Sequence, residues 1–400
     1  MVLLLVSLGV IGGLTWYMTE SWERAHAAQA VRRYVEGLSR HVVRRRRTQT
    51  ALDPVLRSRT RILIVTPALA LLNVVVFLGV IGSASSADDP LRLLEWGASV
   101  GTRTTNGEWW RLVTAAFVHA SAWHLAVNLA ALIAVGRVLE RVAGPVAFAS
   151  TFIGTSLIAG VAGLASSPVT VIGGASAGIC GLYGLLIATW MWGAVQRSET
   201  TVRIASVARL APFTIGFVIY HTWGTGVFAV PEQLAAGTGF AAGIFLCQRA
   251  SEGWAPLRRV AITAAASLCL AASAAVPLRG IADVEPELTR IVEFEARHTQ
   301  AYDEVIVQVT GGRAPRRDAV ALIESQILPE IVAARTRLAE LARVPKEHAQ
   351  LVAAAREYLD IRERSWTLRA DGNRRLRGAT LREADEHEQA ARAVLRALRD

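Results

Sequence analysis

One serine in this chain has a setting in which its side chain could do chemistry. Ser176 stands in the small-residue stretch 173–184, at the head of an apolar run that continues to Trp190. Small residues let neighbouring backbones approach closely, so a hydroxyl there can meet whatever enters the crevice between them. Such stretches also serve as plain packing surfaces in apolar helices. Ser176 is therefore a candidate nucleophile, with helix packing as the alternative interpretation.

A second set of polar side chains lies in the apolar run 112–138, which contains His119, His124 and Asn128. Polar groups inside a membrane span are costly and usually point into the bundle or a wet cavity. His124 and Asn128 are four residues apart, so they share a helix face and can direct hydrogen-bond donors to one point. The alternative is a cluster of hydrogen bonds between helices with no chemical role.

The composition predicts a membrane protein, because 52% of the residues are hydrophobic. The net charge of +10 lies entirely in residues 1–277, where 22 basic residues face 12 acidic ones, whereas residues 278–400 carry 21 of each. Arginine beside apolar runs is typical of cytoplasmic loops. We find no basic patch on a soluble segment, so nucleic acid is not an expected partner. The three cysteines show no ligand spacing, and we expect no metal and no cofactor.

These patterns predict an all-α chain with a polytopic membrane helix bundle and a C-terminal soluble helical bundle. Residues 1–18 are apolar and are followed by positive charge, which favours a signal anchor, and residues 19–61 carry eleven arginines and should be cytoplasmic. The membrane domain should cover 62–277, with a six-span core at 62–248 and one extra span on each side. The expected spans after the arginine-rich segment are 62–81, 112–138, 142–163, the run headed by Ser176, 212–228, 233–247 and 260–276.

Residues 278–400 change to charged sequence with helical periodicity. Gly311-Gly312, Pro345 and the region 372–378 divide this part into about four helices, which should pack antiparallel, and Pro329 should kink one of them. We find no ligand or nucleophile pattern in it. Its partner, if it has one, is not indicated by the sequence.

With this map, the chain resembles the rhomboid family of intramembrane serine proteases over about residues 61–276. The order and spacing of several short motifs carry the resemblance, together with the side of the membrane on which each is expected. The motifs are Trp110-Arg111 in the first outer loop, His119, His124 and Asn128 in the second core span, Gly174-Ala175-Ser176-Ala177 heading the fourth, and Gly239 and Gly243 in the sixth.

The resemblance implies that Ser176 is the nucleophile, which attacks a peptide bond in or near a transmembrane helix of a client membrane protein. It implies that His124 and Asn128 stabilise the oxyanion. His119, Trp110, Arg111, Gly174, Gly239 and Gly243 would be structural. The setting would be a lipid bilayer, the bacterial inner membrane in our interpretation.

One part of the family pattern is missing. The histidine that activates the serine should lie three residues before Gly239, where this chain has Ala236, and the aromatic residue that often packs on it is replaced by Cys180. A serine without an adjacent base is a poor nucleophile. We therefore expect a pseudoprotease that engages transmembrane segments of clients without cutting them. The alternative is an active intramembrane serine endopeptidase, for which His221 is a candidate substitute base. A transporter would need charged or broken-helix sites near the midplane, which the expected spans lack.

Overall fold

The computed structural model describes residues 62–82, 89–195, 204–221, 230–248 and 253–397. The expected signal anchor at 1–18 and the arginine-rich segment 19–61 lie outside the described residues. Within those ranges the chain is almost entirely helical, and its β-structure is limited to one isolated bridge between Ser99 and Ile172. The predicted all-α helical membrane bundle is confirmed.

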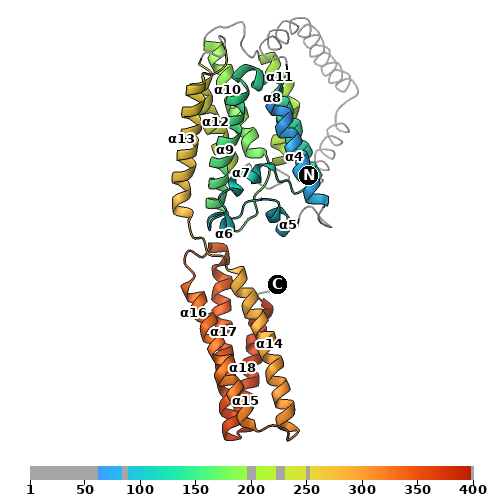
Figure 1. Ribbon diagram of the computed structural model, residues 1–400, viewed down its shortest axis with the longest axis vertical. Helices are drawn as coiled ribbons and strands as arrows, with labels where there is room; N and C mark the ends of the chain where they lie inside the picture. Colours follow the sequence, from blue (N-terminus) through green and yellow to red (C-terminus); the bar gives the residue numbers. More distant parts are fainter. Residues whose placement is uncertain (1–61, 83–88, 196–203, 222–229, 249–252, 398–400) are drawn as a thin grey trace, which may run out of the picture.

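Two bodies follow each other along the chain, a membrane bundle and a narrower C-terminal bundle (Figure 1). Among the described residues, the membrane bundle contains seven long helices and a cap of short ones. Its helices are α4 (Val65–Gly82), α5 (Pro90–Glu95), α6 (Gly101–Thr104), α7 (Arg111–Thr114), α8 (Ala122–Ala143), α9 (Pro145–Ser166), α10 (Ser176–Val195), α11 (Ile204–Ile219), α12 (Val230–Leu246) and α13 (Leu257–Ala275).

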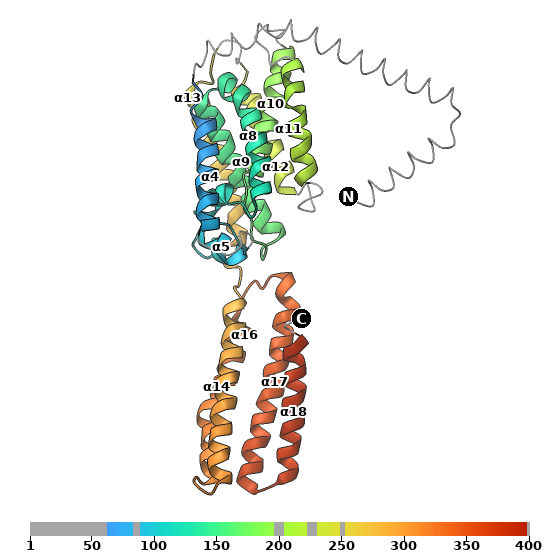
Figure 2. The ribbon, with the colours of Figure 1, turned by 90° about the vertical axis from the view of Figure 1, so that its right-hand side faces the viewer.

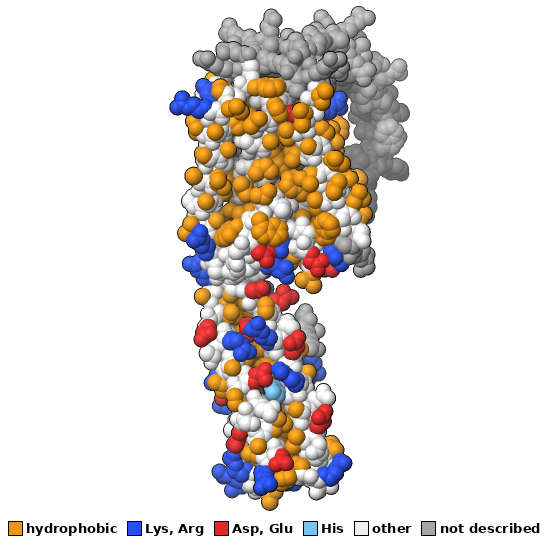
Figure 3. All heavy atoms as spheres, in the orientation of Figure 1, with side chains coloured by type: hydrophobic (Ala, Val, Ile, Leu, Met, Phe, Trp, Pro, Cys, Tyr) orange, Lys and Arg blue, Asp and Glu red, His pale blue; other side chains and the backbone are white. Residues whose placement is uncertain are grey.

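The outer surface of this bundle suits a bilayer. Four segments of the described chain are long and apolar enough to cross a membrane, namely α4, α8, α9 and Leu257–Leu278, and the apolar parts of α10 and α11 are shorter. Figure 3 shows apolar side chains over this body, with arginines gathered at its two ends. The chain is therefore an integral membrane protein in a lipid bilayer.

Several helices begin at other residues than the apolar runs indicate, and three of them matter for the site. α8 begins at Ala122 rather than 112, because Ser121 caps it by accepting a hydrogen bond on Oγ from the His124 amide at 3.1 Å. Residues 111–117 form α7 and a short 3₁₀ turn instead. α11 begins at Ile204, with Pro212 inside it, and α12 begins at Val230 rather than 233. Proline is tolerated in the first helical turn, where its missing N–H has no partner to lose, so Pro231 does not delay α12.

A buried carboxylate ties α8 to α4. Glu140 is fully buried, and its two oxygens accept hydrogen bonds from the amides of Ile64, Val65 and Thr66 at 2.8–2.9 Å. The Thr66 hydroxyl donates a fourth at 2.6 Å. The first amides of a helix have no partner inside the helix, so Glu140 satisfies the N-terminus of α4 from a neighbouring span.

The C-terminal body is a bundle of antiparallel helices around a core that includes Trp366, Tyr358 and Phe294. The expected kink at Pro329 takes another form. A π-helical turn, Ile323–Ile327, precedes Pro329, which then lies in the first turn of the next helix. The helices are α14 (Glu285–Thr310), α15 (Arg316–Leu322), α16 (Leu328–Glu340), α17 (Lys346–Arg375) and α18 (Gly378–Ala397).

The C-terminal bundle joins the membrane bundle at the end that carries the cap helix α5, as Figures 1 and 2 both show. The Asn106 side chain in the cap donates to the Ile281 carbonyl at 2.9 Å. Arg343 donates to the carbonyls of Pro277 and Arg279 in the connection after α13. These hydrogen bonds hold the junction between the two bodies.

Candidate functional site

The strand-like segment before α10 brings the candidate nucleophile into place. Ile172 pairs with Ser99 in the cap, and the Gly174 amide donates to the Ala115 carbonyl at 2.8 Å. Gly174 has a φ of +123°, and a Cβ atom there would lie 2.8 Å from the ring of His124. Glycine is therefore required at position 174, because a side chain there would be strained by the positive φ and would clash with the His124 ring. The close approach places the His124 ring beside the segment that leads to Ser176.

Ser176 is the first residue of α10, and its side chain is buried against α12. Its hydroxyl donates a hydrogen bond to Oε1 of Glu232 at 3.2 Å. A serine hydroxyl has a single proton, so this bond gives the direction in which that proton points. Glu232 lies in the first turn of α12, the helix that carries Ala236 one turn further along.

Small residues bring α10 and α12 into backbone contact. A Cβ atom at Gly239 would lie 2.0 Å from the Gly181 carbonyl oxygen, and one at Gly184 would lie 2.0 Å from the Ala236 carbonyl oxygen. One turn on, a Cβ at Gly243 would lie 2.5 Å from Cβ of Ala188. Larger residues would separate the helices. This contact sets the distance between the head of α10 and the first turn of α12.

Three histidines gather beside this pair. The ring of His124 lies 4.8 Å from that of His119 and 5.6 Å from that of His221, centroid to centroid, and Tyr220 stacks on it at 5.7 Å. Nε2 of His119 and Nε2 of His124 are buried and have no hydrogen-bond partner within the described ranges. The structure therefore brings together the histidines that the sequence singled out, and leaves polar atoms facing the interior.

Asn128 lies one turn along α8 from His124. Its amide nitrogen donates to the His124 carbonyl at 2.9 Å, and its Oδ1 is buried without a partner in the described part of the chain. One of its two N–H groups is thus used within the helix, and the second remains for another acceptor. His221 packs on Phe217 at 4.5 Å and on His124.

An apolar cavity of about 620 Å³ adjoins the site between α10, α11 and α12. Cys180 and Ala236 both line it, and these are the positions where the family pattern expects an aromatic ring and a histidine. Trp190 and Ile187 line it further along α10. Two small residues in place of two rings leave this volume open.

Arg111 organises the cap of short helices. Its side chain is 4% exposed, donates to the carbonyls of Leu94 and Ala98, and pairs with Glu108. Its guanidinium lies 4.5 Å above the ring of Trp110. A guanidinium with several donors can fix a loop by its carbonyls. Arg111 and Trp110 therefore hold the loop that covers this end of the bundle.

Glu232 is the residue that the sequence interpretation missed. The expected sixth span began at 233, which left Glu232 in a loop, whereas α12 includes it. It lies four residues before Ala236 and so shares that residue's helix face. A search for any proton acceptor one turn from the missing histidine, on the same face, would have found it.

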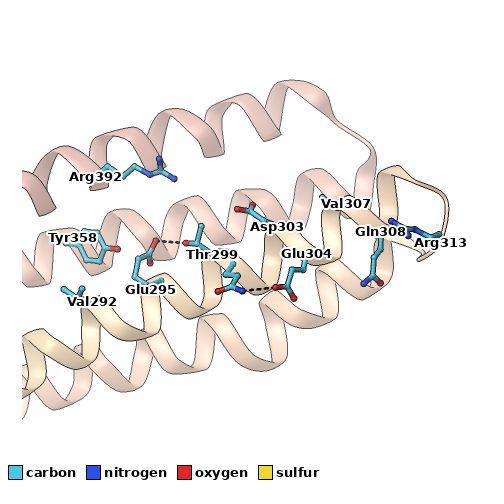
Figure 4. A pocket seen from close by; sticks show the side chains of 12 residues that line it. Val292, Glu295, Thr299, Asp303, Glu304, Val307, Gln308, Arg313, Tyr358 and Arg392 are labelled. Carbon is cyan, nitrogen blue, oxygen red and sulfur yellow. Dashed lines mark hydrogen bonds between the residues drawn. The ribbon is translucent and has the colours of Figure 1, made fainter.

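A second hollow lies far from Ser176, in the C-terminal bundle (Figure 4). It has a volume of about 1070 Å³ and is lined by residues of α14, α17 and α18, among them Glu295, Asp303, Tyr358 and Arg392. No cluster of three or more metal-ligating side chains occurs anywhere among the residues that the structure describes.

Residues 106–250 match the family model described as the Rhomboid domain. The chain is 34% identical to the rhomboid-family protein YdcA of Bacillus subtilis over 83 residues, which is 20% of this chain and 42% of that protein. It is 35% identical to the rhomboid protease GluP of the same organism over 95 residues, covering 24% of this chain and 18% of GluP. Over 166 residues it is 26% identical to rhomboid-like protease 2 of Toxoplasma gondii, covering 40% and 56% respectively.

The matches cover well under two thirds of each relative and leave α4, α13 and the C-terminal bundle outside the family model. The family model includes α8, α10 and α12, the helices that carry His124, Ser176 and Glu232. Residues 106–250 therefore form a Rhomboid domain, which lies in the membrane bundle.

Proposed function

We propose that the rhomboid domain engages transmembrane segments of client membrane proteins at the crevice that Ser176 faces. The observation that carries this proposal is the apolar cavity between α10 and α11, which begins one helical turn from Ser176 at Cys180. Ile187 and Val218 line it and are 55% and 38% exposed on the surface that faces lipid. An apolar side chain of a membrane segment can enter it without leaving the bilayer.

The polar groups beside the cavity give the segment's backbone a partner. A transmembrane helix that opens locally exposes amides and carbonyls, which are costly in hydrocarbon. Nε2 of His124 and Oδ1 of Asn128, both buried without a partner among the described residues, and the hydroxyl of Ser176 lie near the capped end of the bundle, where such groups can be met. Clients with helix-breaking residues near the outer leaflet are therefore the expected class.

Two versions of this function differ in the fate of the bound segment. A pseudoprotease would hold the segment intact, whereas an endopeptidase would cut it with Ser176, His124 and Asn128. The names of the relatives above include rhomboid proteases, and the hydrogen bond from Ser176 to a carboxylate favours the second version, because the serine has an acceptor despite Ala236. His221 contacts His124 and Phe217, which is the setting of a packed core histidine.

A site-specific photocrosslinker would test client engagement in membranes. We would place it at position 187, in the cavity, and at 268, an exposed leucine on the lipid face of α13. The partner would be a single-span reporter with a Gly-Pro pair in its outer half, compared with an all-leucine version. Crosslinking from 187 to the Gly-Pro reporter at several times the yield from 268 is expected. Equal yields from the two positions, or from the two reporters, would contradict the proposal.

A further inference from the structure

The proton of Ser176 has an acceptor in this structure, on the helix where the family's base is missing. Oε1 of Glu232 accepts the hydrogen bond from Ser176 Oγ at 3.2 Å. This is at the long end for O–H···O contacts, and catalytic hydrogen bonds are often long before substrate binds. We propose that Glu232 is the general base of this site, so that Ser176 and Glu232 form a serine–glutamate catalytic dyad. The inference rests on the proposed engagement of client segments at Ser176.

The geometry of α12 explains how a carboxylate can replace the histidine. Glu232 precedes Ala236 by four residues, which is about 6 Å along the helix axis and the same face. The carboxylate therefore reaches Ser176 from the first turn of α12, whereas a histidine at position 236 would lie one turn further along that helix. The close backbone contact between Gly181 and Gly239 holds the two helices at the separation that this reach needs.

The surroundings of Glu232 differ from those of a structural carboxylate. Its Oε2 is buried and has no hydrogen-bond partner within the described residues, and no arginine or lysine there forms an ion pair with it. Glu140, which is fully buried among the spans, accepts four hydrogen bonds that cap α4. Glu140 has a complete structural role, whereas Glu232 keeps acceptor capacity directed at Ser176.

The chemistry balances as an acyl transfer. The Ser176 proton passes to Oε1 of Glu232 while Oγ bonds to the carbonyl carbon, and the C=O electron pair moves onto oxygen, where donors from His124 and Asn128 are expected. The tetrahedral intermediate collapses, the C–N bond breaks, and Glu232 returns the proton to the departing amine. Water then attacks the ester, giving its proton to Glu232, which passes it to Oγ as the acid leaves.

The test uses the full chain in detergent with a fluorophosphonate probe, which bonds only to an activated serine. The unchanged protein should label and Ser176→Ala should not. Glu232→Gln keeps the size and a hydrogen-bond acceptor but cannot take the proton, so labelling should slow by about 100-fold or more. Glu95→Gln removes an exposed carboxylate from the cap, where it pairs with Arg92, and should label like the unchanged protein.

A rescue experiment distinguishes whether Glu232 acts as a base or only stabilises the structure. Adding Ala236→His to Glu232→Gln restores a base at the family's position, and labelling should return. If Glu232→Gln does not fold, Glu232→Asp is the second test. The shorter side chain moves the carboxylate out of reach of Ser176, so labelling should also slow. Labelling at the unchanged rate in Glu232→Gln, or in folded Glu232→Asp, would overturn the inference.

The inference and the proposed function fail in different ways. No labelling of the unchanged protein, with crosslinking from position 187 intact, would overturn the dyad and leave a protein that binds clients without cutting them. Labelling that depends on Glu232, with no crosslinking to the Gly-Pro reporter, would support the dyad and contradict client engagement through the cavity.

Discussion

Single residues in this protein take roles that their type alone does not reveal, and two glutamates of the membrane bundle, the buried Glu140 and the half-buried Glu232, show this. Glu140 caps the amides of α4, and Glu232 accepts from a serine. Both lie in terminal turns of helices, where a carboxylate can reach groups of a neighbouring helix. Their different partners give different expectations on substitution.

Replacing Glu140 should cost stability. Glu140→Gln turns one acceptor oxygen into an NH₂ group that faces the amides of Ile64 to Thr66. Loss of charge-assisted hydrogen bonds at a buried cap should lower the free energy of unfolding by about 2–3 kcal/mol. Thermal unfolding in detergent would measure this, with Glu95→Gln as the exposed control. Equal midpoints for the two variants would mean that the cap contributes nothing.

Two glycines with the same backbone angle allow the effect of backbone strain to be distinguished from that of a steric clash. Gly174 and Gly107 both have a φ of +123°, but a Cβ at 107 meets no atom, whereas one at 174 meets the His124 ring. Alanine at either position should cost about 1–3 kcal/mol in strain. Only Gly174→Ala should also displace His124 and reduce probe labelling at Ser176. Similar labelling of both variants at matched stability would argue against a role for His124.

At the scale of elements, the contact between α10 and α12 decides whether the site exists. The sequence indicated both helices, the small-residue faces and the positions of Ser176, His124 and Asn128, because apolar periodicity and spacing are local properties. It did not indicate Glu232, because Pro231 and the polar pair Glu232-Gln233 are typical of a loop. In the structure Pro231 lies in the first turn of α12, where proline is tolerated, and Glu232 follows it inside the helix.

A matched pair of glycines on α12 tests that contact. Gly239→Ala places a methyl group against the Gly181 carbonyl, whereas Gly237→Ala meets no atom within 4 Å. Gly239→Ala should lower the unfolding midpoint and abolish labelling of Ser176, because the helices must separate. Gly237→Ala should be neutral or slightly stabilising, since alanine favours a helix. A Gly239→Ala protein that labels normally would show that helix separation does not set the Ser176–Glu232 distance.

In the C-terminal bundle the last break lies inside the region 372–378, as the sequence indicates. α17 runs through Gly372 to Arg375, and Leu376 adopts the left-handed conformation that ends it before α18 begins at Gly378. Gly372 is where Leu381 packs closely. Helix pairing with α18 outweighs the low helix propensity of one glycine.

On the scale of the whole molecule, the C-terminal bundle carries a buried charged network. Arg362 is 1% exposed, pairs with Glu295 at 2.5 Å and lies 3.8 Å from Glu388, which also pairs with Arg369 and Arg392. Arg362 further lies 4.7 Å above the ring of Trp366. These contacts join α14, α17 and α18 around one centre.

The network should make the bundle sensitive to acid. Burial raises the pKa of Glu388, but Arg362, Arg369 and Arg392 outweigh this and hold the pKa below its ordinary value. A carboxyl group whose pKa is lower in the folded than in the unfolded protein stabilises the fold at pH values above its unfolded pKa of about 4.3. This stabilisation is lost as the pH falls through the pKa of the folded state. Hydrogen exchange in α17 and α18 of the full chain should therefore accelerate as the pH falls below about 5, after correction for the intrinsic rate. Glu388→Gln should flatten this response, and an unchanged response would contradict the assignment.

The junction between the bundles has a consequence for the shape of any client. Arg343 and Asn106 hold the connection after α13 by hydrogen bonds, so the C-terminal bundle is fixed to the capped end of the membrane domain. Its first helix, α14, has 26 residues and is about 39 Å long. If the crevice engages clients as proposed, a client whose folded extramembrane domain follows its membrane segment directly would collide with this bundle on one side. Clients with an extended spacer between the membrane segment and the folded domain should fit. The length of that spacer would then affect which clients are accepted, although the crevice makes no contact with it.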